Sequence, residues 1–360
     1  MLGFKLPYPA MPTEGVKRSL DLSTKCSIKD DEFIKMSRDI LDELNKKLPK
    51  FMFSNKIIMS ETETSLRNDL GTDLVQKDKY LSFALLVKHR NSMNMMDDYM
   101  VYINREVDFE AVLKELIIKC EAYEELVDFS EEGEKVQVIL LGDHLEFLTK
   151  FKSDMRGDIF TTGASLFSGK LGEKIFSDKF SLIVNRDPEK YFITFFDGEG
   201  VVLPNDKFTL IENGMLKALY ASKRMAKQYN LQETGSALLD YDSIPDITPL
   251  GFYIDAGELA IAKSDKTIKE LLGGKKAVLV TMATGGDYTP QGEYASPIQR
   301  AYLFDGENIL GRLPQLSMSS NIYDMFGKDF IGVSSDVNYP GSPYSYLVCE
   351  MNVHKTDGWV

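Results

Sequence analysis

The sequence predicts an α+β protein of two domains, an α/β domain followed by a domain rich in β-strands. Three observations support this prediction. The chain up to residue 130 alternates helix patterns with strand patterns, whereas the chain from residue 131 contains mostly short strand patterns broken by Gly, Pro and Asp. The length of 360 residues also suffices for two domains that each bury a core.

The composition is that of a folded protein. Hydrophobic residues make up 43% of the chain and charged residues 27%, and the 21 Phe and 17 Tyr supply enough apolar surface to offset chain entropy. The formal net charge of -13 repels phosphate backbones, and the basic residues are scattered among acidic ones. We therefore expect no nucleic-acid partner.

The cysteines and the apolar segments bear on localisation. Cys26, Cys120 and Cys349 are odd in number and far apart, which fits a reducing compartment better than a disulfide framework. Prolines interrupt Met1–Gly15, where a signal peptide needs an apolar run. No apolar stretch is long enough to cross a bilayer. We therefore expect a cytoplasmic protein that has no membrane partner.

Two helices are predicted in the N-terminal domain. The first occupies Ser27–Leu48, where apolar residues recur at helical spacing, with Ser27 as the expected cap and Pro49 as the stop. The second occupies Phe109–Val127. It places Cys120 on its apolar side, so we expect this thiol to be a buried hydrophobe rather than a reactive group.

Strands are predicted between these two helices. Lys56–Leu66, Tyr80–His89 and Tyr99–Ile103 are rich in strand-forming residues, and turn residues separate them at Asn68–Gly71 and Asn91–Asp98. Short connections of this kind join neighbouring antiparallel strands. The segment is therefore expected to form an antiparallel meander.

The acidic, glycine-containing loop Ser130–Lys135 is the predicted domain boundary, which divides the chain into residues 1–130 and 131–360. A buried strand is expected at Val136–Leu141 and a short helix at His144–Phe151. Beyond them, strand patterns are interrupted by helical segments at Leu219–Tyr229 and Asp265–Leu272. We therefore expect residues 131–360 to form a β-rich domain, either a sandwich or a curved barrel.

Histidines do not form a recognisable metal motif. The chain has His89, His144 and His354, and only His144 precedes a glutamate at short spacing. An HExxH site needs two histidines on one helix face, but Leu and Thr occupy positions 148 and 149. We therefore interpret His144 as a residue at the start of a helix.

The segment Asp197-Gly198-Glu199-Gly200 is the clearest local cluster of reactive groups. Two carboxylates between glycines could bind a cation or act as an acid/base pair. The more common structure for such a composition is a tight hairpin turn, here following the strand-like Thr194–Phe196. No nucleophile elbow and no phosphate-binding loop is present in the sequence.

An ordered series of motifs resembles the TldD/PmbA family, which is also called modulator of DNA gyrase. The motifs are Gly163–Glu173, Phe196–Val201, Leu210–Leu219, Glu233–Ala237, Gly285–Gly292 and Gly327–Phe330. Together they cover roughly the last two-thirds of the chain, which is more specific than any single motif. The segment Ser27–Val127 resembles the second half of the usual N-terminal domain, so a shortened domain is expected.

The resemblance also implies that this chain lacks the zinc site of the active relatives. Family members with peptidase activity look like zinc enzymes with an HExxxH motif just before the Gly-Ala/Thr-Ser segment. The matching positions here are Leu148, Thr149 and Ser153, and Cys349 lies beyond the place of the family's zinc cysteine. The pattern is similar to the PmbA-like (TldE) branch, whose members lack the metal. No cofactor and no catalytic residue is therefore assigned.

The leading hypothesis is a non-catalytic PmbA/TldE-like subunit or a degenerate relative of a TldD-type zinc metallopeptidase. The resemblance implies a homodimer, or a heterodimer with a TldD-like subunit, that encloses a cavity for unfolded peptide. Candidate peptide-binding residues are Gly163, Ser165, Asp197, Glu199, Gly285 and Gly286. Two alternatives stay open: a homodimeric peptide-binding scaffold, and an active peptidase whose unconventional metal ligands are Asp197, Glu199 and Asp287.

Overall fold

The computed structural model describes residues 13–106, 108–128, 135–141, 145–238, 258–283, 285–337, 339 and 342–356. It confirms the α+β class. The chain forms two compact units. Unit 1 comprises Met1–Asp21, Glu63–Lys77 and Leu148–Ala262, and unit 2 comprises Leu22–Thr62, Asp78–Phe147 and Lys263–Val360. No helix in the described ranges has the length and apolar composition that a bilayer crossing requires.

Each unit draws on residues from both sides of the predicted boundary at residue 130. The compact units therefore do not coincide with the two stretches 1–130 and 131–360. Most of the boundary loop, residues 129–134, lies outside the described residues. The division into an N-terminal and a C-terminal folding domain stays a prediction.

The first sheet contains the predicted meander. Its strands are β1 (Lys17–Asp21), β2 (Phe51–Arg67), β3 (Asp73–His89) and β4 (Asp98–Asn104), in the order β1-β3-β2 with β4 beside β3. Strands β3 and β4 are antiparallel, as predicted. Strand β1 was not predicted, and it pairs with β3 in parallel.

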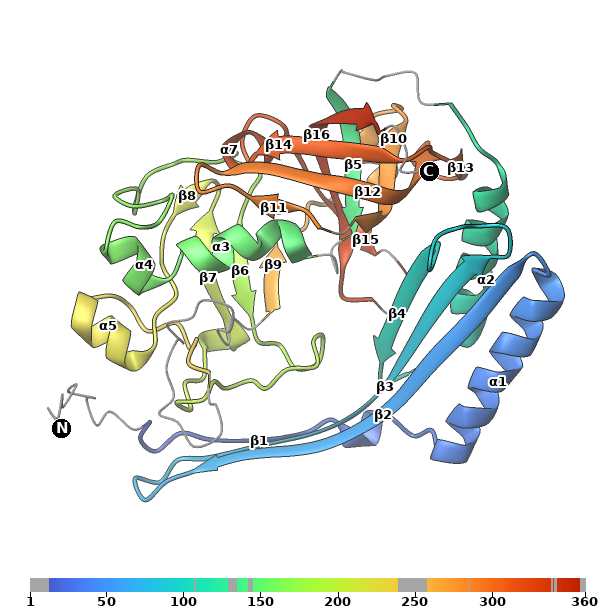
Figure 1. Ribbon diagram of the computed structural model, residues 1–360. Helices are drawn as coiled ribbons and strands as arrows, with labels where there is room; N and C mark the ends of the chain where they lie inside the picture. Colours follow the sequence, from blue (N-terminus) through green and yellow to red (C-terminus); the bar gives the residue numbers. More distant parts are fainter. Residues whose placement is uncertain are drawn as a thin grey trace, which may run out of the picture. The chain divides into compact units, whose positions relative to one another are not determined.

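Two helices cover one face of this sheet in unit 2, namely α1 (Asp30–Lys47) and α2 (Phe109–Glu124) (Figure 1). Their apolar sides pack on buried residues of β2, β3 and β4, and Cys120 is buried among them as predicted. A short 3-10 helix, η1 (Ser23–Lys25), precedes α1.

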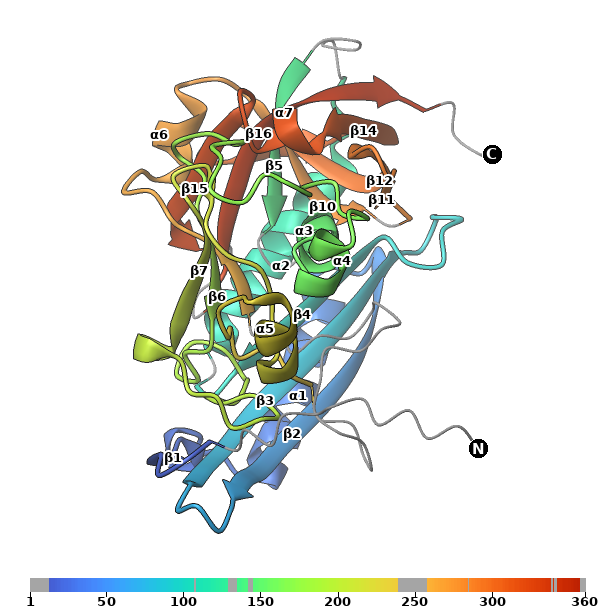
Figure 2. The ribbon, with the colours of Figure 1, turned by 90° about the vertical axis from the view of Figure 1, so that its left-hand side faces the viewer.

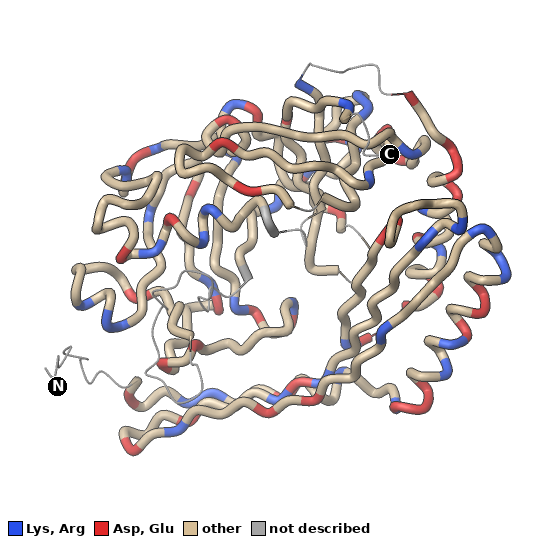
Figure 3. Tube along the Cα trace, viewed as in Figure 1, with Lys and Arg blue, Asp and Glu red and all other residues tan. Residues whose placement is uncertain are grey.

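The predicted cap of the first helix is wrong. Helix α1 has Lys29 as its N-cap, which makes no side-chain capping bond. Acidic residues fill its first turn and lysines its last, which complements the helix dipole without a cap. Acidic and basic residues are interspersed along the helix (Figure 3).

A closed barrel forms most of the rest of unit 2. Its strands are β5 (Lys135–Leu141), β10 (Ala277–Ala283), β12 (Glu293–Phe304), β14 (Leu316–Asn321) and β16 (Ser345–Lys355). They follow the order β10-β5-β16-β14-β12, and β12 pairs back with β10 (Figure 2). This closure confirms the barrel alternative of the sequence prediction.

Short elements complete unit 2. Strands β11 (Asp287–Tyr288) and β13 (Ile309–Arg312) pair with β12, and β15 (Phe330–Val337) pairs with β16. Helix α7 (Ile322–Met325) follows β14. Helix α6 (Ile268–Leu272) buries Ile268 and Leu272 against the outer face of β5, β10 and β16. It begins later than predicted because Thr267 and Glu270 form a capping box.

Unit 1 contains a small antiparallel sheet and short helices. The sheet has the order β8-β7-β6-β9, formed by Met215–Leu216, Lys207–Glu212, Leu182–Asn185 and Glu258–Ile261 respectively. The helices are α3 (Thr149–Asp154), α4 (Gly157–Thr161) and α5 (Lys223–Tyr229), with the 3-10 turn η3 (Pro204–Asp206). The 3-10 turn η2 (Leu145–Leu148), of which all but Leu148 belongs to unit 2, precedes α3.

Two predicted helices of the second domain differ from the expected ones. Helix α5 begins at Lys223 rather than Leu219 because the Ser222 hydroxyl caps it, accepting from the backbone N–H of Met225 at 3.2 Å. The helix predicted from His144 is the 3-10 turn η2 followed by α3. His144 itself lies outside the described residues.

Candidate functional site

The Asp197 carboxylate organises the turn that the sequence marked as a candidate site. Its Oδ1 accepts the backbone N–H groups of Glu199 at 2.9 Å and Val201 at 2.8 Å, and its Oδ2 accepts that of Ala237 at 3.0 Å. The side chain is buried. Burial raises its pKa, while the backbone hydrogen bonds and the charge of Arg186 oppose this change. This geometry matches the tight turn, one of the two interpretations of the segment Asp197–Gly200 given by the sequence.

The guanidinium of Arg186 stabilises the same turn. It is fully buried and donates to the carbonyl oxygens of Thr194, Phe196 and Gly235, each at 3.2 Å. These bonds connect the Asp197 turn to the segment that begins at Glu233. Two of the motifs quoted from the sequence are therefore adjacent within unit 1.

Glu199 is buried against the start of helix α5. Its Oε2 accepts the backbone N–H of Lys223 at 2.9 Å, where the helix dipole favours a negative charge. The ammonium of Lys223 donates to the hydroxyl of Thr13 at 2.6 Å and to the Glu199 carbonyl at 3.3 Å. Glu199 therefore has an evident structural role in connecting the turn to α5.

The end of η2 and helix α3 occupy the positions where the resemblance places a zinc motif. Leu148 is buried and has no donor atom for a metal, and positions 149 and 153 carry hydroxyls. The three residues do not fit a zinc ion. The buried Asp154 carboxylate instead accepts the backbone N–H of Leu166 at 2.7 Å and pairs with Lys150 at 3.0 Å.

The glycine-rich segment after α4 is held against α3 by that bond to Asp154. Ser165 is buried, and its hydroxyl accepts the backbone N–H of Phe167 at 2.9 Å. Gly163 has a φ of +81°, and no heavy atom lies within 4 Å of the place that a Cβ would take. Its backbone is therefore open on that side, whereas Ser165 is engaged in a local turn.

The other predicted site residues belong to unit 2. Gly285 has a φ of +83° and open space beside it, whereas a Cβ on Gly286 would lie 2.3 Å from the Cβ of Ser296. Asp287 is exposed, and its carboxylate accepts the backbone N–H of Tyr288 at 2.7 Å. Asp287 thus belongs to a different compact unit from Asp197 and Glu199.

Metal-ligand geometry is not found in the described part of the chain. In those ranges, no group of three or more His, Cys, Asp or Glu side chains is placed to hold an ion. Cys349 is buried in β16, and burial raises the pKa of its thiol. The alternative with Asp197, Glu199 and Asp287 as ligands stays a prediction.

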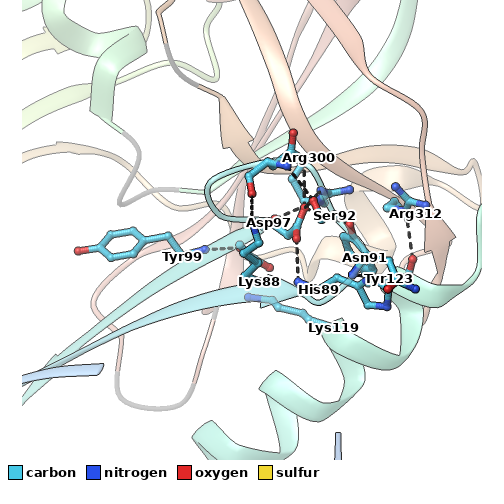
Figure 4. Close-up of polar contacts among 12 residues, drawn as sticks. Lys88, His89, Asn91, Ser92, Asp97, Tyr99, Lys119, Tyr123, Arg300 and Arg312 are labelled. Atoms are coloured by element: carbon cyan, nitrogen blue, oxygen red, sulfur yellow. Dashed lines mark hydrogen bonds and ion pairs between the residues drawn. The ribbon is translucent and has the colours of Figure 1, made fainter. Parts of the chain in front are cut away.

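A buried polar cluster that the sequence did not predict surrounds Asp97 in unit 2 (Figure 4). Its Oδ2 accepts the backbone N–H of His89 at 2.8 Å. Its Oδ1 accepts from the Ser92 hydroxyl at 2.8 Å and the Asn94 amide at 3.0 Å. Burial opposes the charge on this carboxylate, but the hydrogen bonds outweigh burial and lower its pKa.

The opposite side of the Asp97 cluster comes from distant elements. The Tyr123 hydroxyl of α2 donates to Asp97 at 3.0 Å, and the Arg300 guanidinium of β12 donates at 3.1 Å. The guanidinium groups of Arg300 and Arg312 lie 4.4 Å and 4.5 Å from the centre of the Tyr123 ring. No local motif joins these residues, so sequence reasoning had no signal for the cluster.

Comparison with known families agrees with the resemblance. A model of the PmbA/TldA metallopeptidase C-terminal domain matches residues 133–355. A metalloprotease of Methanothermobacter thermautotrophicus is 27% identical over 180 residues, which are 50% of this chain and 38% of that protein. A metalloprotease of Methanocaldococcus jannaschii is 26% identical over 174 residues, 48% of this chain and 37% of that protein.

Solved structures share the fold. TldE from Thermococcus kodakarensis superposes with a TM-score of 0.71 at 19% identity, covering 96% of this chain and 79% of that one. A candidate modulator of DNA gyrase from Bacteroides thetaiotaomicron has a TM-score of 0.75 at 16% identity, covering 97% and 77%. The matched region spans less than half of the metalloproteases named above. From the motifs, the barrel and the matched residues 133–355, we conclude that the chain belongs to the PmbA/TldD metallopeptidase family.

Proposed function

We propose that this protein is a non-catalytic, TldE-like member of the PmbA/TldD family that binds extended peptide and functions as a dimer. The observation that carries the proposal is the identity of Leu148, Thr149 and Ser153. A zinc peptidase needs imidazole, carboxylate or thiolate donors to hold the ion and a base to activate its water. An alkyl group and two hydroxyls supply neither.

The bonding of α3 supports a structural role for that helix. Asp154 is the acidic residue of α3, and its carboxylate is engaged by Lys150 and by the backbone of Leu166. Its charge is therefore neutralised inside the protein and used to hold the glycine-rich segment. The likeness to TldE at 19% identity concerns the fold alone, so the assignment depends on these side chains.

Open glycine backbone supports the peptide-binding part of the proposal. Gly163 and Gly285 have positive φ and free space beside the Cα atom, so another main chain can approach closely. Extended peptides bind by adding main-chain hydrogen bonds to such backbone, with little dependence on side chains. In this proposal, the other subunit of the dimer is either a second copy of the chain or a TldD-like subunit.

Mass measurement tests the assembly. The purified chain is run alone and with a TldD-like metallopeptidase on size-exclusion chromatography with light scattering. A stable homodimer alone, or a heterodimer in the mixture, is the expected result. A monomer that elutes separately from the TldD-like protein contradicts the proposal. A homodimer that captures peptide and ignores the TldD-like protein supports the scaffold alternative.

Metal analysis tests the absence of catalysis. Protein prepared without chelator is expected to contain well below one transition-metal ion per chain and to leave a fluorogenic peptide intact. Asp287→Asn and the matched exposed variant Glu307→Gln should behave alike. Stoichiometric metal that is lost in Asp287→Asn and retained in Glu307→Gln would replace this proposal with the active-peptidase alternative.

A further inference from the structure

The loop between β3 and β4 exposes two methionines. It runs from Arg90 to Asp97 with the sequence RNSMNMMD. The exposed fraction is 98% for Met93 and 89% for Met95, and Met52 follows at 39% among the described methionines. Large apolar side chains are rarely displayed this fully, so the two thioethers are in contact with solvent rather than with the core.

The polar groups of the loop bond inward and hold it in place. Asp97, at the base of the loop, accepts from the Ser92 hydroxyl (Figure 4). It also accepts from the Asn94 amide. The Asn94 N–H donates to the Ser92 hydroxyl at 3.1 Å, and the Lys88 ammonium donates to the Asn94 carbonyl. The bonds to Asp97 from Tyr123 and Arg300 connect this base to α2 and the barrel. The loop conformation therefore does not depend on burying Met93 or Met95.

We propose that Met93 and Met95 form a reversible oxidation site, modified by hydrogen peroxide or another two-electron peroxide oxidant before the other methionines in the described part of the chain. A lone pair of the thioether sulfur attacks one peroxide oxygen, an S–O bond forms, and the O–O bond breaks. The sulfur loses two electrons and becomes a sulfoxide. With hydrogen peroxide, the hydroxide that leaves takes up a proton to form water and the S–OH group releases a proton, so no net proton is consumed. A thiol-dependent methionine sulfoxide reductase reverses the change.

Burial protects the core methionines from the same reaction. Met155, Met325 and Met351 have no exposed surface, so peroxide reaches their sulfur atoms only after local opening. Oxidation at Met93 and Met95 makes two apolar side chains polar without inserting an oxygen into the core. The modification thus changes the chemistry of this surface and leaves the fold intact.

A peroxide pulse followed by peptide mass spectrometry tests the proposal on the full chain. Met93 and Met95 should gain oxygen at least about tenfold faster than Met155 and Met325, in keeping with their access to solvent. Circular dichroism and Tm should stay unchanged after the first two oxygen atoms. Equal rates at buried and loop methionines, or unfolding after two oxygens, would overturn the proposal.

Leucine variants provide the matched controls. The double variant Met93→Leu/Met95→Leu should lose the fast phase, whereas Met52→Leu should keep it. Sulfoxide reductase with dithiothreitol should restore the original mass of the wild-type protein. A fast phase that survives in the double variant assigns the reaction to other methionines and refutes the site. These outcomes are independent of the dimer and peptide measurements described above.

Discussion

Two buried carboxylates show how the local hydrogen bonds decide the charge state of a residue. Burial raises the pKa of Asp197 despite its three backbone donors and nearby Arg186. Around Asp97, side-chain donors and a backbone N–H outweigh the effect of burial and lower the pKa. The same residue type thus has opposite shifts because the number and strength of its donors differ.

Replacing Asp97 by Asn should destabilise the protein by about 3 kcal/mol, because it leaves the buried guanidinium of Arg300 without its negative partner. A lowered folded pKa means that this stabilisation is present above the unfolded pKa of about 3.9 and is lost as pH falls through the folded value. Urea unfolding from pH 6 to pH 2.5 measures both effects.

The difference in unfolding free energy between wild type and Asp97→Asn should shrink as the pH falls below about 4. Exposed Asp42 provides a control, because Asp42→Asn should lower the free energy of unfolding far less at pH 6. A difference that stays constant down to pH 2.5 would show that the Asp97 charge does not stabilise the fold.

Asp197→Asn should lower the free energy of unfolding by about 2 kcal/mol. An amide NH₂ would face backbone N–H donors, so one or more hydrogen bonds are lost. Asp287→Asn is the exposed counterpart, with an expected change within about 0.5 kcal/mol. Chemical denaturation at pH 7 compares them. Equal stabilities would remove the structural role assigned to Asp197 and favour its function as a ligand.

The turn between β7 and β8 shows how a backbone contact limits the sequence of an element. Gly214 has a φ of +79°, and a Cβ there would lie 2.2 Å from the carbonyl oxygen of Phe176. Its own N–H donates to the Phe180 carbonyl at 2.8 Å. The backbone of the hairpin therefore packs directly on the segment from Phe176 to Phe180, because Gly214 has no side chain.

Gly214→Ala should lower stability by about 3 kcal/mol, the sum of about 1 kcal/mol for left-handed backbone and the cost of overpacking. Gly163→Ala has the same sign of φ and open space, so it should cost only about 1 kcal/mol. Thermal unfolding of the two variants separates conformational strain from the clash. Equal losses would show that Phe176 yields to the added methyl group.

Chelation tests whether the whole molecule depends on a bound metal. Removing a structural ion would cost several kcal/mol of folding free energy and lower Tm by several degrees. We expect EDTA to shift Tm by less than about 1 °C. The described residues offer no group of three metal-binding side chains. A fall of several degrees that added zinc reverses would contradict this expectation. Differential scanning calorimetry gives the comparison directly.

The sequence by itself determined the elements whose pattern is local. Apolar residues at helical spacing predicted α1 and α2, and β-forming runs predicted β2, β3 and β4. Helix ends were less accurate, because capping by Ser222 or Thr267 shortens a helix that periodicity alone would extend. The ordered glycine motifs led to the family, and the residues at 148, 149 and 153 to the inference of a missing zinc site.

Only the tertiary structure decided which distant residues meet. Strand β1 pairs in parallel with β3, and β12 closes the barrel on β10. A strand's local pattern sets which face is buried but does not name its partner strand. Arg300 reaches Asp97 across 203 positions of the chain, and three backbone N–H groups converge on Asp197. Such contacts depend on where the folded backbone brings the groups together, and local propensity carries no information about that.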